Sequence, residues 1–387
     1  MQPTQILISA GEASGDMYAA RLAVELRNRL PVSLFGMGGP RMREAGVDLI
    51  ADSKELSVVG ISEVWGKIPK LFEILNRVTA DANRRRPPLA ILTDFPGFHL
   101  RLARKLKGTG IPSVYFICPQ FWAWRPWRAN LVRRRFVRGL CIFPFEEDWY
   151  RKRGVPADFI GHPLVGEVRA KQTREQFATA HGLDSTRPIV TLLPGSRHSE
   201  LEQHMPVLVN ACARIAENRG AQFVLAVAPD LHAEELKQFL RPDVPMTLVT
   251  EETYDAVAAA DLAIVSSGTS TVETALLGTP MIVMYRVSRL TAALARPLIR
   301  TPMIAMVNLI AGRRVVPELI QSDFTVEHVA AEAARLLDSR DAREEMREDL
   351  GEVRSRLGPP GAIARAADII AGMLAGAGQL RSGSLVS

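Results

Sequence analysis

The regular alternation of short apolar runs with longer amphipathic segments most constrains how this chain can fold. A run such as Leu89–Leu92 suits a strand buried on both faces, because its apolar residues follow one another without polar alternation. The first series predicts strands at Gln5–Ala10, Ser33–Phe35, Leu89–Leu92, Ser113–Ile117 and Leu140–Phe143, and helices at Met17–Leu30 and Phe98–Lys107. Strands that alternate with helices in this way predict a parallel α/β sheet covered on both faces.

The same alternation starts again after a polar stretch at residues 165–187. It predicts strands at Ile189–Leu193, Gln222–Ala228, Met246–Val249, Leu262–Val265 and Met281–Met284, and helices at Leu201–Asn218 and Ser270–Leu277. A chain of 387 residues also exceeds one ordinary core. We therefore expect two Rossmann-like lobes, at residues 1–165 and 166–350, with 351–387 forming a C-terminal helix that packs back on the first lobe, and a flexible tail.

Composition and charge limit the kinds of partner that the protein can have. The formal net charge of +6 suits an anionic partner, whether a phosphorylated substrate, an acidic membrane surface or nucleic acid. Three scattered cysteines without a Cys-x-x-Cys pair argue against a disulfide framework and favour a reduced cytosolic setting. We expect neither a signal peptide nor a transmembrane run. Without Asp-x-Asp or His-x-x-x-His motifs, we expect no catalytic metal and no cofactor.

Two loops of the first lobe follow strands at the edge where open α/β sheets bind ligands. Gly11–Asp16 turns from strand to helix, and glycines there let a ligand approach the backbone while the helix start attracts anions. The motif matches neither Gly-x-Gly-x-x-Gly nor a Walker loop, and Ser14 could equally be a helix cap. Asp94, which follows another strand, is a candidate general base, although a lone aspartate is more often a turn residue.

The second lobe carries two loops suited to phosphate. Leu193–Arg197 follows a strand and ends in an arginine, whose fork of donors suits phosphate oxygens. In Val265–Glu273, small and hydroxylated residues open a helix, so that Gly268, Thr269 and Ser270 would offer backbone N–H groups to a phosphate. Glu273, one turn into that helix, could accept hydrogen bonds from sugar hydroxyls, although a capped helix with an early glutamate is common. Together the loops predict a diphosphate in the cleft between the lobes.

Three segments mix apolar and basic residues: 56–78, 121–138 and 286–314. Tryptophan beside lysine or arginine suits a bilayer interface with anionic head groups. Each segment has an alternative, which is a core helix for the first and third and a solvated face for the second. Taken together they favour peripheral membrane binding, with 56–78 as the first candidate.

Beyond these local patterns, the motifs of the chain, in order, resemble those of the lipid-A-disaccharide synthase family, glycosyltransferases of the GT-B type. The resemblance is carried by Gly11–Asp16, Gly36–Gly39, Cys118–Trp124, Phe159–Pro163, Leu193–Arg197, Ser267–Glu273, Tyr285–Ser288, Val307–Arg313 and Val316–Gln321. It implies an inverting transfer of 2,3-diacylglucosamine from its UDP donor to 2,3-diacylglucosamine 1-phosphate. The products are lipid A disaccharide 1-phosphate and UDP.

The resemblance also implies site roles. Asp94 would be the base, and Gly97 stands where some relatives carry a second aspartate, so a mechanism with two carboxylates at these positions is unavailable. The residues expected to bind UDP or substrate are Ser14, Arg197, Gly268, Thr269, Ser270, Glu273, Asn308 and Gln321. Both lipid substrates imply a cytoplasmic enzyme, peripheral on the inner face of the cytoplasmic membrane.

Two other functions stay open at the level of the residues. One is another GT-B enzyme, such as a UDP-N-acetylglucosamine 2-epimerase, which would not need the apolar and basic segments. The other is a non-enzymatic protein that binds anions or lipid head groups through the arginines at 125–138. No helix-turn-helix, RNP or zinc signature supports nucleic-acid binding. The sequence leaves a homodimer undecided.

Overall fold

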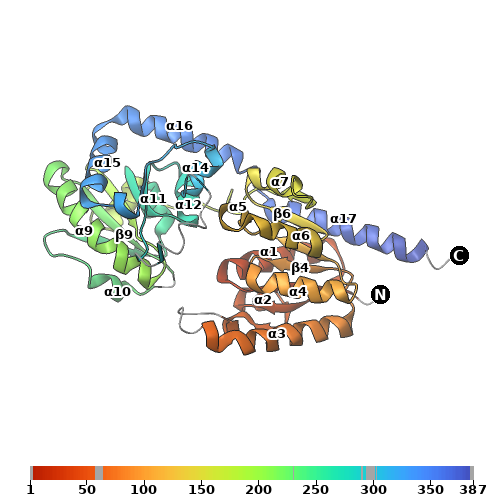
Figure 1. The fold of residues 1–387 in the computed structure, drawn as a ribbon. Coiled ribbons are helices and arrows are strands. Elements are labelled where there is room, and N and C mark those ends of the chain that lie inside the picture. Colours follow the sequence, from red (N-terminus) through yellow and green to blue (C-terminus); the bar gives the residue numbers. More distant parts are fainter. Residues whose placement is uncertain are drawn as a thin grey trace. The chain divides into compact units, whose positions relative to one another are not determined.

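The computed structural model describes residues 3–56, 64–229, 231–288, 291–292, 301 and 303–383, and their side chains except at 56, 64–68 and 377–383. The chain forms two compact units, Met1–Pro163 with Gly358–Ser387, and Leu164–Leu357 (Figure 1). It returns to the first unit at Gly358 rather than at 351, because the helix α16, Arg340–Arg356, continues that far in the second unit.

The first unit is built on a seven-stranded sheet with the order β3-β2-β1-β4-β5-β6-β7. Its strands are β1 Thr4–Ala10, β2 Val32–Gly38, β3 Asp48–Asp52, β4 Ala90–Thr93, β5 Ser113–Phe116, β6 Arg138–Cys141 and β7 Ala157–Phe159. Its helices are α1 Ala13–Arg29, α2 Pro40–Glu44, α3 Val64–Arg85, α4 Pro96–Gly108, α5 Phe121–Trp124, α6 Ala129–Arg135, α7 Pro144–Arg151 and α17 Ala362–Gly383, with short 3-10 turns at Ser53–Leu56 and Pro126–Arg128. Every strand pair is parallel, which confirms the predicted sheet type.

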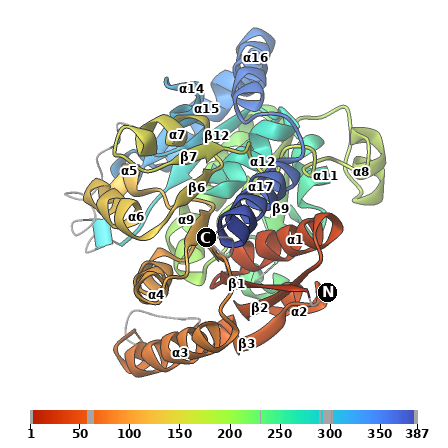
Figure 2. The same cartoon turned by 90° about the vertical axis from the view of Figure 1, so that its right-hand side faces the viewer.

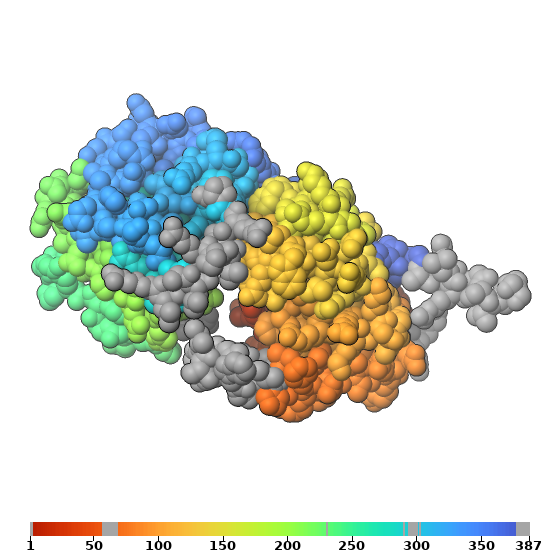
Figure 3. All heavy atoms as spheres, in the orientation of Figure 1, coloured from red at the N-terminus to blue at the C-terminus, as the bar shows by residue number. Residues whose placement is uncertain are grey.

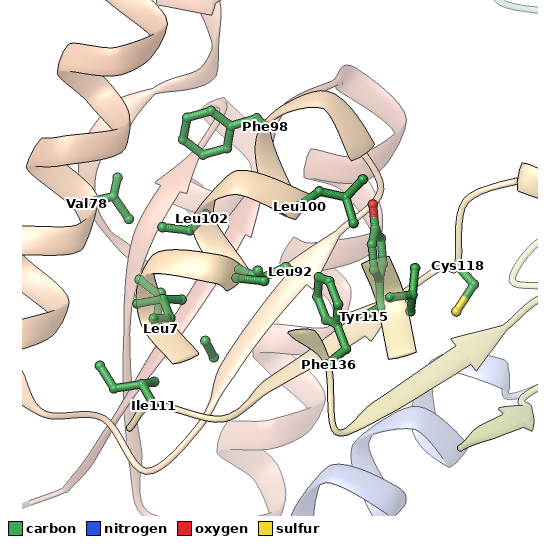
Figure 4. Packing of buried hydrophobic residues seen from close by; sticks show 14 of the residues in the cluster. Leu7, Val78, Leu92, Phe98, Leu100, Leu102, Ile111, Tyr115, Cys118 and Phe136 are labelled. Atoms are coloured by element: carbon green, nitrogen blue, oxygen red, sulfur yellow. The ribbon is translucent and has the colours of Figure 1, made fainter. Parts of the chain in front are cut away.

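Apolar side chains pack both faces of this sheet. On one face, α3, α4 and α6 cover buried strand residues such as Leu7, Leu92 and Tyr115 (Figure 4). Right-handed crossovers place α1 on the other face. There α17 lies beside α1, with an ion pair from Arg29 Nε to Asp368 Oδ1 at 2.7 Å (Figure 2). The buried side chains Ala366, Ala367 and Ile370 of the C-terminal helix thus belong to the core of the first unit.

The second unit is built on a six-stranded parallel sheet with the order β10-β9-β8-β11-β12-β13. Its strands are β8 Ile189–Leu193, β9 Gln222–Val227, β10 Met246–Thr250, β11 Leu262–Ser266, β12 Met281–Tyr285 and β13 Glu318–Ile320. Its other helices are α8 Arg174–Ala180, α9 His198–Arg219, α10 Ala233–Lys237, α11 Thr253–Ala258, α12 Thr269–Leu277, α14 Met306–Ala311 and α15 Val326–Asp338, with a 3-10 turn at Gln321–Asp323. The apolar pattern of the sequence does not predict β3, β7 and β13, which are all edge strands.

Asp16 ties the two glycine motifs of the first unit together. Its buried carboxylate accepts hydrogen bonds from the backbone N–H groups of Gly39 at 2.6 Å, Arg41 at 3.0 Å and Met42 at 3.2 Å. A Cβ atom at Gly39 would lie 2.7 Å from Asp16 Oδ2, so this close approach requires glycine. The carboxylate at α1 therefore satisfies the open N–H groups at the start of α2.

Asp16→Ala should destabilise the first unit by roughly 2 kcal/mol, because it leaves buried backbone N–H groups without an acceptor. Urea unfolding followed by circular dichroism measures this. The control is Asp148→Ala, at an exposed position in α7, which should change the unfolding free energy little. Equal effects of the two substitutions would contradict a capping role for Asp16.

Candidate active site

The strand order of each unit reverses direction at one place, and ligands of open α/β sheets bind beside such a reversal. In the first unit it lies between β1 and β4, and in the second between β8 and β11. The loops that leave these strands are residues 11–12 and 94–95 in the first unit, and 194–197 and 267–268 in the second. Topology thus selects the loops that carry Asp94, Arg197 and Gly268.

Asp94 sits in a strained turn that buried side chains hold in place. Both Asp94 and Phe95 are left-handed, with φ of 48° and 45°, a conformation that non-glycine residues seldom adopt. The Asp94 carbonyl accepts hydrogen bonds from His99 Nδ1 at 2.7 Å and from the Tyr115 hydroxyl at 3.0 Å. The other ring nitrogen of His99 lies 2.9 Å from the hydroxyl of Ser9 in β1. These bonds fix the backbone from which the carboxylate projects.

Burial and a neighbouring charge shift the pKa values of Asp94 and His99 at this turn. Burial, with a contribution from the negative charge of Glu12, raises the pKa of Asp94 from its usual value near 3.8 to about 6. Burial lowers the pKa of His99 to about 4, so its ring is neutral at pH 7. Nδ1 then donates to the Asp94 carbonyl while Nε2 accepts from Ser9. Asp94 is a carboxylate whose proton affinity lies closer to neutrality than usual, as a general base needs.

The β1 loop packs directly against the Asp94 turn. A Cβ atom at Gly11 would lie 2.1 Å from the ring of Phe95, so glycine is required there. Ser14 is exposed in the first turn of α1, whose N-cap position is Glu12. The alternative that Ser14 caps this helix is therefore wrong, and its hydroxyl lies on the exposed side of the loop.

Arg197 stands at the N-cap of α9 with most of its side chain exposed. One of its nitrogens, Nη1, lies 3.0 Å from Glu200 Oε1, and the side chain is 73% exposed, so the other donors are available. Glu200 Oε2 also accepts from the backbone N–H of Ser196 at 2.9 Å. Gly195 has φ of 130°, and a Cβ atom there would lie 2.4 Å from Glu200 Oε2. Gly195 and Glu200 thus shape the loop that presents Arg197.

The start of α12 offers backbone donors. Gly268 is the N-cap of α12, and no side chain caps this helix start. The first N–H groups of a helix have no intrahelical partners, so these donors are open to a ligand. Thr269 is exposed and Ser270 half-buried, and a Cβ atom at Gly268 would meet open space. Glu273, one turn on, accepts from the Tyr254 hydroxyl at 3.0 Å, and burial raises its pKa. This helix start is suited to an anion, with a carboxylate beside it.

Asn308 was predicted to contact substrate, but its hydrogen-bonding capacity is used inside the second unit. The residue is fully buried, and Oδ1 accepts from the N–H groups of Val315 at 2.8 Å and Val316 at 3.0 Å. Nδ2 donates to the Val316 carbonyl at 3.0 Å and to Glu318 Oε1 at 2.8 Å. An amide has two donors and two acceptor sites, so Asn308 is saturated. It holds Glu318, which caps α14 through the N–H of Ala305.

Gln321 also uses its side-chain amide to hydrogen-bond the backbone of the second unit. Its side-chain amide pairs with Val287, donating to the carbonyl at 3.2 Å and accepting from the N–H at 3.1 Å. Its own carbonyl accepts from Arg286 Nε at 3.3 Å. Gln321 has φ of 54° and begins the turn after β13. It therefore fastens the segment after β12 to the segment after β13.

His204 is a site-shaping residue that the sequence analysis missed. This buried side chain of α9 has Nδ1 2.6 Å from the Pro194 carbonyl, and its Nε2 accepts from the Arg286 N–H at 2.9 Å. Burial lowers its pKa, which favours the neutral ring that these bonds require. A polar residue on the apolar side of a predicted helix, just after a candidate loop, was the signal that could have identified it.

The three segments predicted to bind a membrane contain both buried and exposed side chains. In 56–78, the described side chains Ile74, Leu75 and Val78 are buried, Phe72 is 46% exposed, and the part up to 68 lies outside the described side chains. In 121–138, Trp124 is 38% and Trp127 60% exposed. Within the third segment, Met306–Ala311 form α14, which is largely buried, and 289–290, 293–300 and 302 lie outside the described residues. No described helix is long and apolar enough to cross a membrane.

Metal ligands do not gather in the described part of the chain. Within it, no three histidine, cysteine, aspartate or glutamate side chains are placed to hold a metal ion together. The three cysteines are buried free thiols.

Comparison with known proteins decides the family. A family model described as "Lipid-A-disaccharide synthetase" matches residues 6–366. The chain is 46% identical over 374 residues to the lipid-A-disaccharide synthase of Solibacter usitatus, covering 96% of this chain and 98% of that protein. It is 43% identical over 375 residues to that of Myxococcus xanthus, with the same coverage. The chain belongs to the lipid-A-disaccharide synthase family.

Solved structures agree on the fold. A putative UDP-N-acetylglucosamine 2-epimerase from Listeria monocytogenes superimposes with a TM-score of 0.63 over 96% of each chain, at 12% identity. That identity shows only the GT-B fold, so it does not favour the epimerase that the residues had left open. The membership confirms the implied function in lipid A disaccharide synthesis, and the protein is a glycosyltransferase. A UDP-sugar donor and a lipid acceptor follow from this membership.

Proposed function

We propose that Asp94 is the base of an inverting transfer from UDP-2,3-diacylglucosamine to 2,3-diacylglucosamine 1-phosphate. The oxygen of the acceptor 6-hydroxyl attacks the anomeric carbon, its proton passes to Asp94, and the bond to UDP breaks. The products are the β-1,6-linked disaccharide 1-phosphate and UDP. The observation that carries this proposal is the Asp94 carboxylate at the sheet reversal, with a pKa of about 6 and its backbone locked by His99.

The UDP leaving group is assigned to the second unit. Arg197 has donors to spare, and the open N–H groups at Gly268, Thr269 and Ser270 would stabilise the charge that develops on the diphosphate. Glu273 would accept from ribose hydroxyls. On the first unit, the exposed hydroxyl of Ser14 would contact substrate. Asn308 and Gln321 act here as positioning residues.

Peripheral binding to the inner membrane face is part of this proposal. Trp124 and Trp127 are exposed, and arginine groups lie over their rings, with Arg125 Cζ 4.6 Å from the Trp124 centroid and Arg128 Cζ 5.5 Å from the Trp127 centroid. Aromatic rings beside cations suit the head-group region of an anionic bilayer. A homodimer is not required, because every residue of the proposal belongs to one chain.

Asp94→Asn should lower kcat by about 100-fold to 10,000-fold, because the amide cannot take the hydroxyl proton. UDP release with the two lipid substrates measures kcat, and calorimetric titration should find UDP affinity unchanged. Asp148→Asn, an exposed aspartate of α7, is the control. An active Asp94→Asn enzyme would remove Asp94 from the role of base.

The pH dependence of the reaction rate should show the ionisation of the Asp94 carboxylate. The base works only when ionised, so the rate should fall as the pH drops through about 6. Glu12→Gln removes a charge that raises the pKa of Asp94, and the acid limb should therefore move to lower pH, whereas Glu44→Gln in α2 should leave it in place. Burial raises the pKa of Glu146 to about 7. If the rate instead fell through pH 7 and Glu12→Gln did not shift that fall, Glu146 would be the base.

Arg197→Ala should raise the Kd for UDP by about 10-fold to 100-fold, the range expected for a charge-assisted hydrogen bond. Calorimetric titration with UDP tests this, and Arg340→Ala, at a side chain 84% exposed in α16, is the control. Wild-type UDP affinity in Arg197→Ala would place the diphosphate elsewhere.

A further inference from the structure

A hollow of about 740 Å³ opens on the first unit between α3, α4 and α6. Five basic side chains line it: Arg101, Arg104, Lys105, Arg128 and Arg135. We call it the cationic groove. The elements that form it lie on the orange and amber face of the first unit that is turned toward the viewer in Figure 3.

The cationic groove is also apolar. Leu75 is buried in its wall, Leu131 is half-buried, and the large side chains of Phe72 and Trp127 are 46% and 60% exposed. Large apolar groups left open to solvent beside cations are suited to a ligand that is both apolar and anionic. The volume lies in the range of small-ligand sites, so it suits the polar end of a lipid with the first part of its chains.

The cations of the groove lack anionic partners. Within the described residues, no carboxylate forms an ion pair with any of the five, and none lines the hollow. Arg104 makes no hydrogen bond there, and the buried Nε of Arg128 has no acceptor. Burial, and then repulsion by Arg125 and Arg101, lower the pKa of Arg128. An anion in the groove would relieve this repulsion.

The cationic groove reaches the start of α4, directly after the turn that carries the proposed base. Pro96 and Gly97, which follow the Asp94 turn, form part of its lining. Tyr115, whose hydroxyl donates to the Asp94 carbonyl, packs on Phe136 with ring centroids 4.5 Å apart, one residue beyond Arg135. The lining of the cationic groove thus begins two residues after the proposed base.

We infer that the cationic groove binds the lipid acceptor by its phosphate, with Arg104 and Arg128 as phosphate ligands and the apolar wall holding the start of the acyl chains. This inference rests on the proposed function, because it takes the acceptor to be a phosphorylated diacylglucosamine. A phosphate monoester carries nearly two negative charges at pH 7 and offers oxygens that match the guanidinium fork. The groove would select acceptors that carry the phosphate.

The test compares 2,3-diacylglucosamine 1-phosphate with its dephosphorylated form as acceptors, in neutral detergent micelles with UDP-2,3-diacylglucosamine as donor. The enzymes are the full-length wild type, Arg104→Gln, Arg128→Gln, and the control Arg133→Gln, an exposed arginine of α6 outside the groove. Thermal unfolding establishes that each variant is folded. Arg104→Gln removes no hydrogen bond of the described structure, so it should keep wild-type stability.

With the phosphorylated acceptor, each groove variant should raise the acceptor KM by at least about 10-fold while the donor KM and kcat stay near wild type. With the dephosphorylated acceptor, wild type and variants should be equally poor, because arginine and phosphate act as a pair. Variants that weaken both acceptors equally, or neither, would overturn the inference. So would variants that lose binding only to phosphatidylglycerol vesicles, since the groove would then serve membrane lipid. No UDP release by the wild type would instead refute the proposed function itself.

Discussion

A buried neutral histidine fixes one candidate-site loop in each unit, and the backbone geometry of both loops depends on these rings. His99 joins the Asp94 carbonyl to Ser9 of the neighbouring strand. His204 joins the Pro194 carbonyl to the N–H of Arg286. Each ring lies in the helix that follows its loop, and each bonds across the sheet reversal. A neutral imidazole offers one donor and one acceptor, so burial, which lowers the pKa of both rings, preserves the pattern that the loops require.

Such fixation matters because loops at strand ends otherwise lack partners for their backbone groups. The left-handed turn at Asp94 and Phe95 costs conformational energy, and it persists because its carbonyl receives two hydrogen bonds from buried side chains. In the second unit, Asn308 and Gln321 perform the same task for the segments after β12 and β13. Preorganised loops can then present donors without reorganising during the reaction.

The sequence was sufficient for the parallel sheets and for most central strands, because continuous apolar runs are unambiguous there. It failed at β3, β7 and β13, which are short edge strands, and residues such as Asp48 and Glu318 interrupt their apolar pattern. The candidate loops followed from strand ends and glycines. The roles of Asn308 and His204 could not follow, because a sequence does not show which buried backbone groups need a partner.

Hydrogen-bonding capacity separates the motif residues that build the loops from those that can bind a ligand. Asp16 and Asn308 belong to motifs that carry the family resemblance, yet the surrounding structure uses the bonds that they can make. Arg197 and Arg104 keep donors that the described protein does not use. Both side chains are exposed, so water solvates the donors that the protein leaves unused, and an anionic ligand can replace that water. Arg197 follows a strand end and Arg104 lines the cationic groove, and anionic substrates would supply partners for their unused donors at both places.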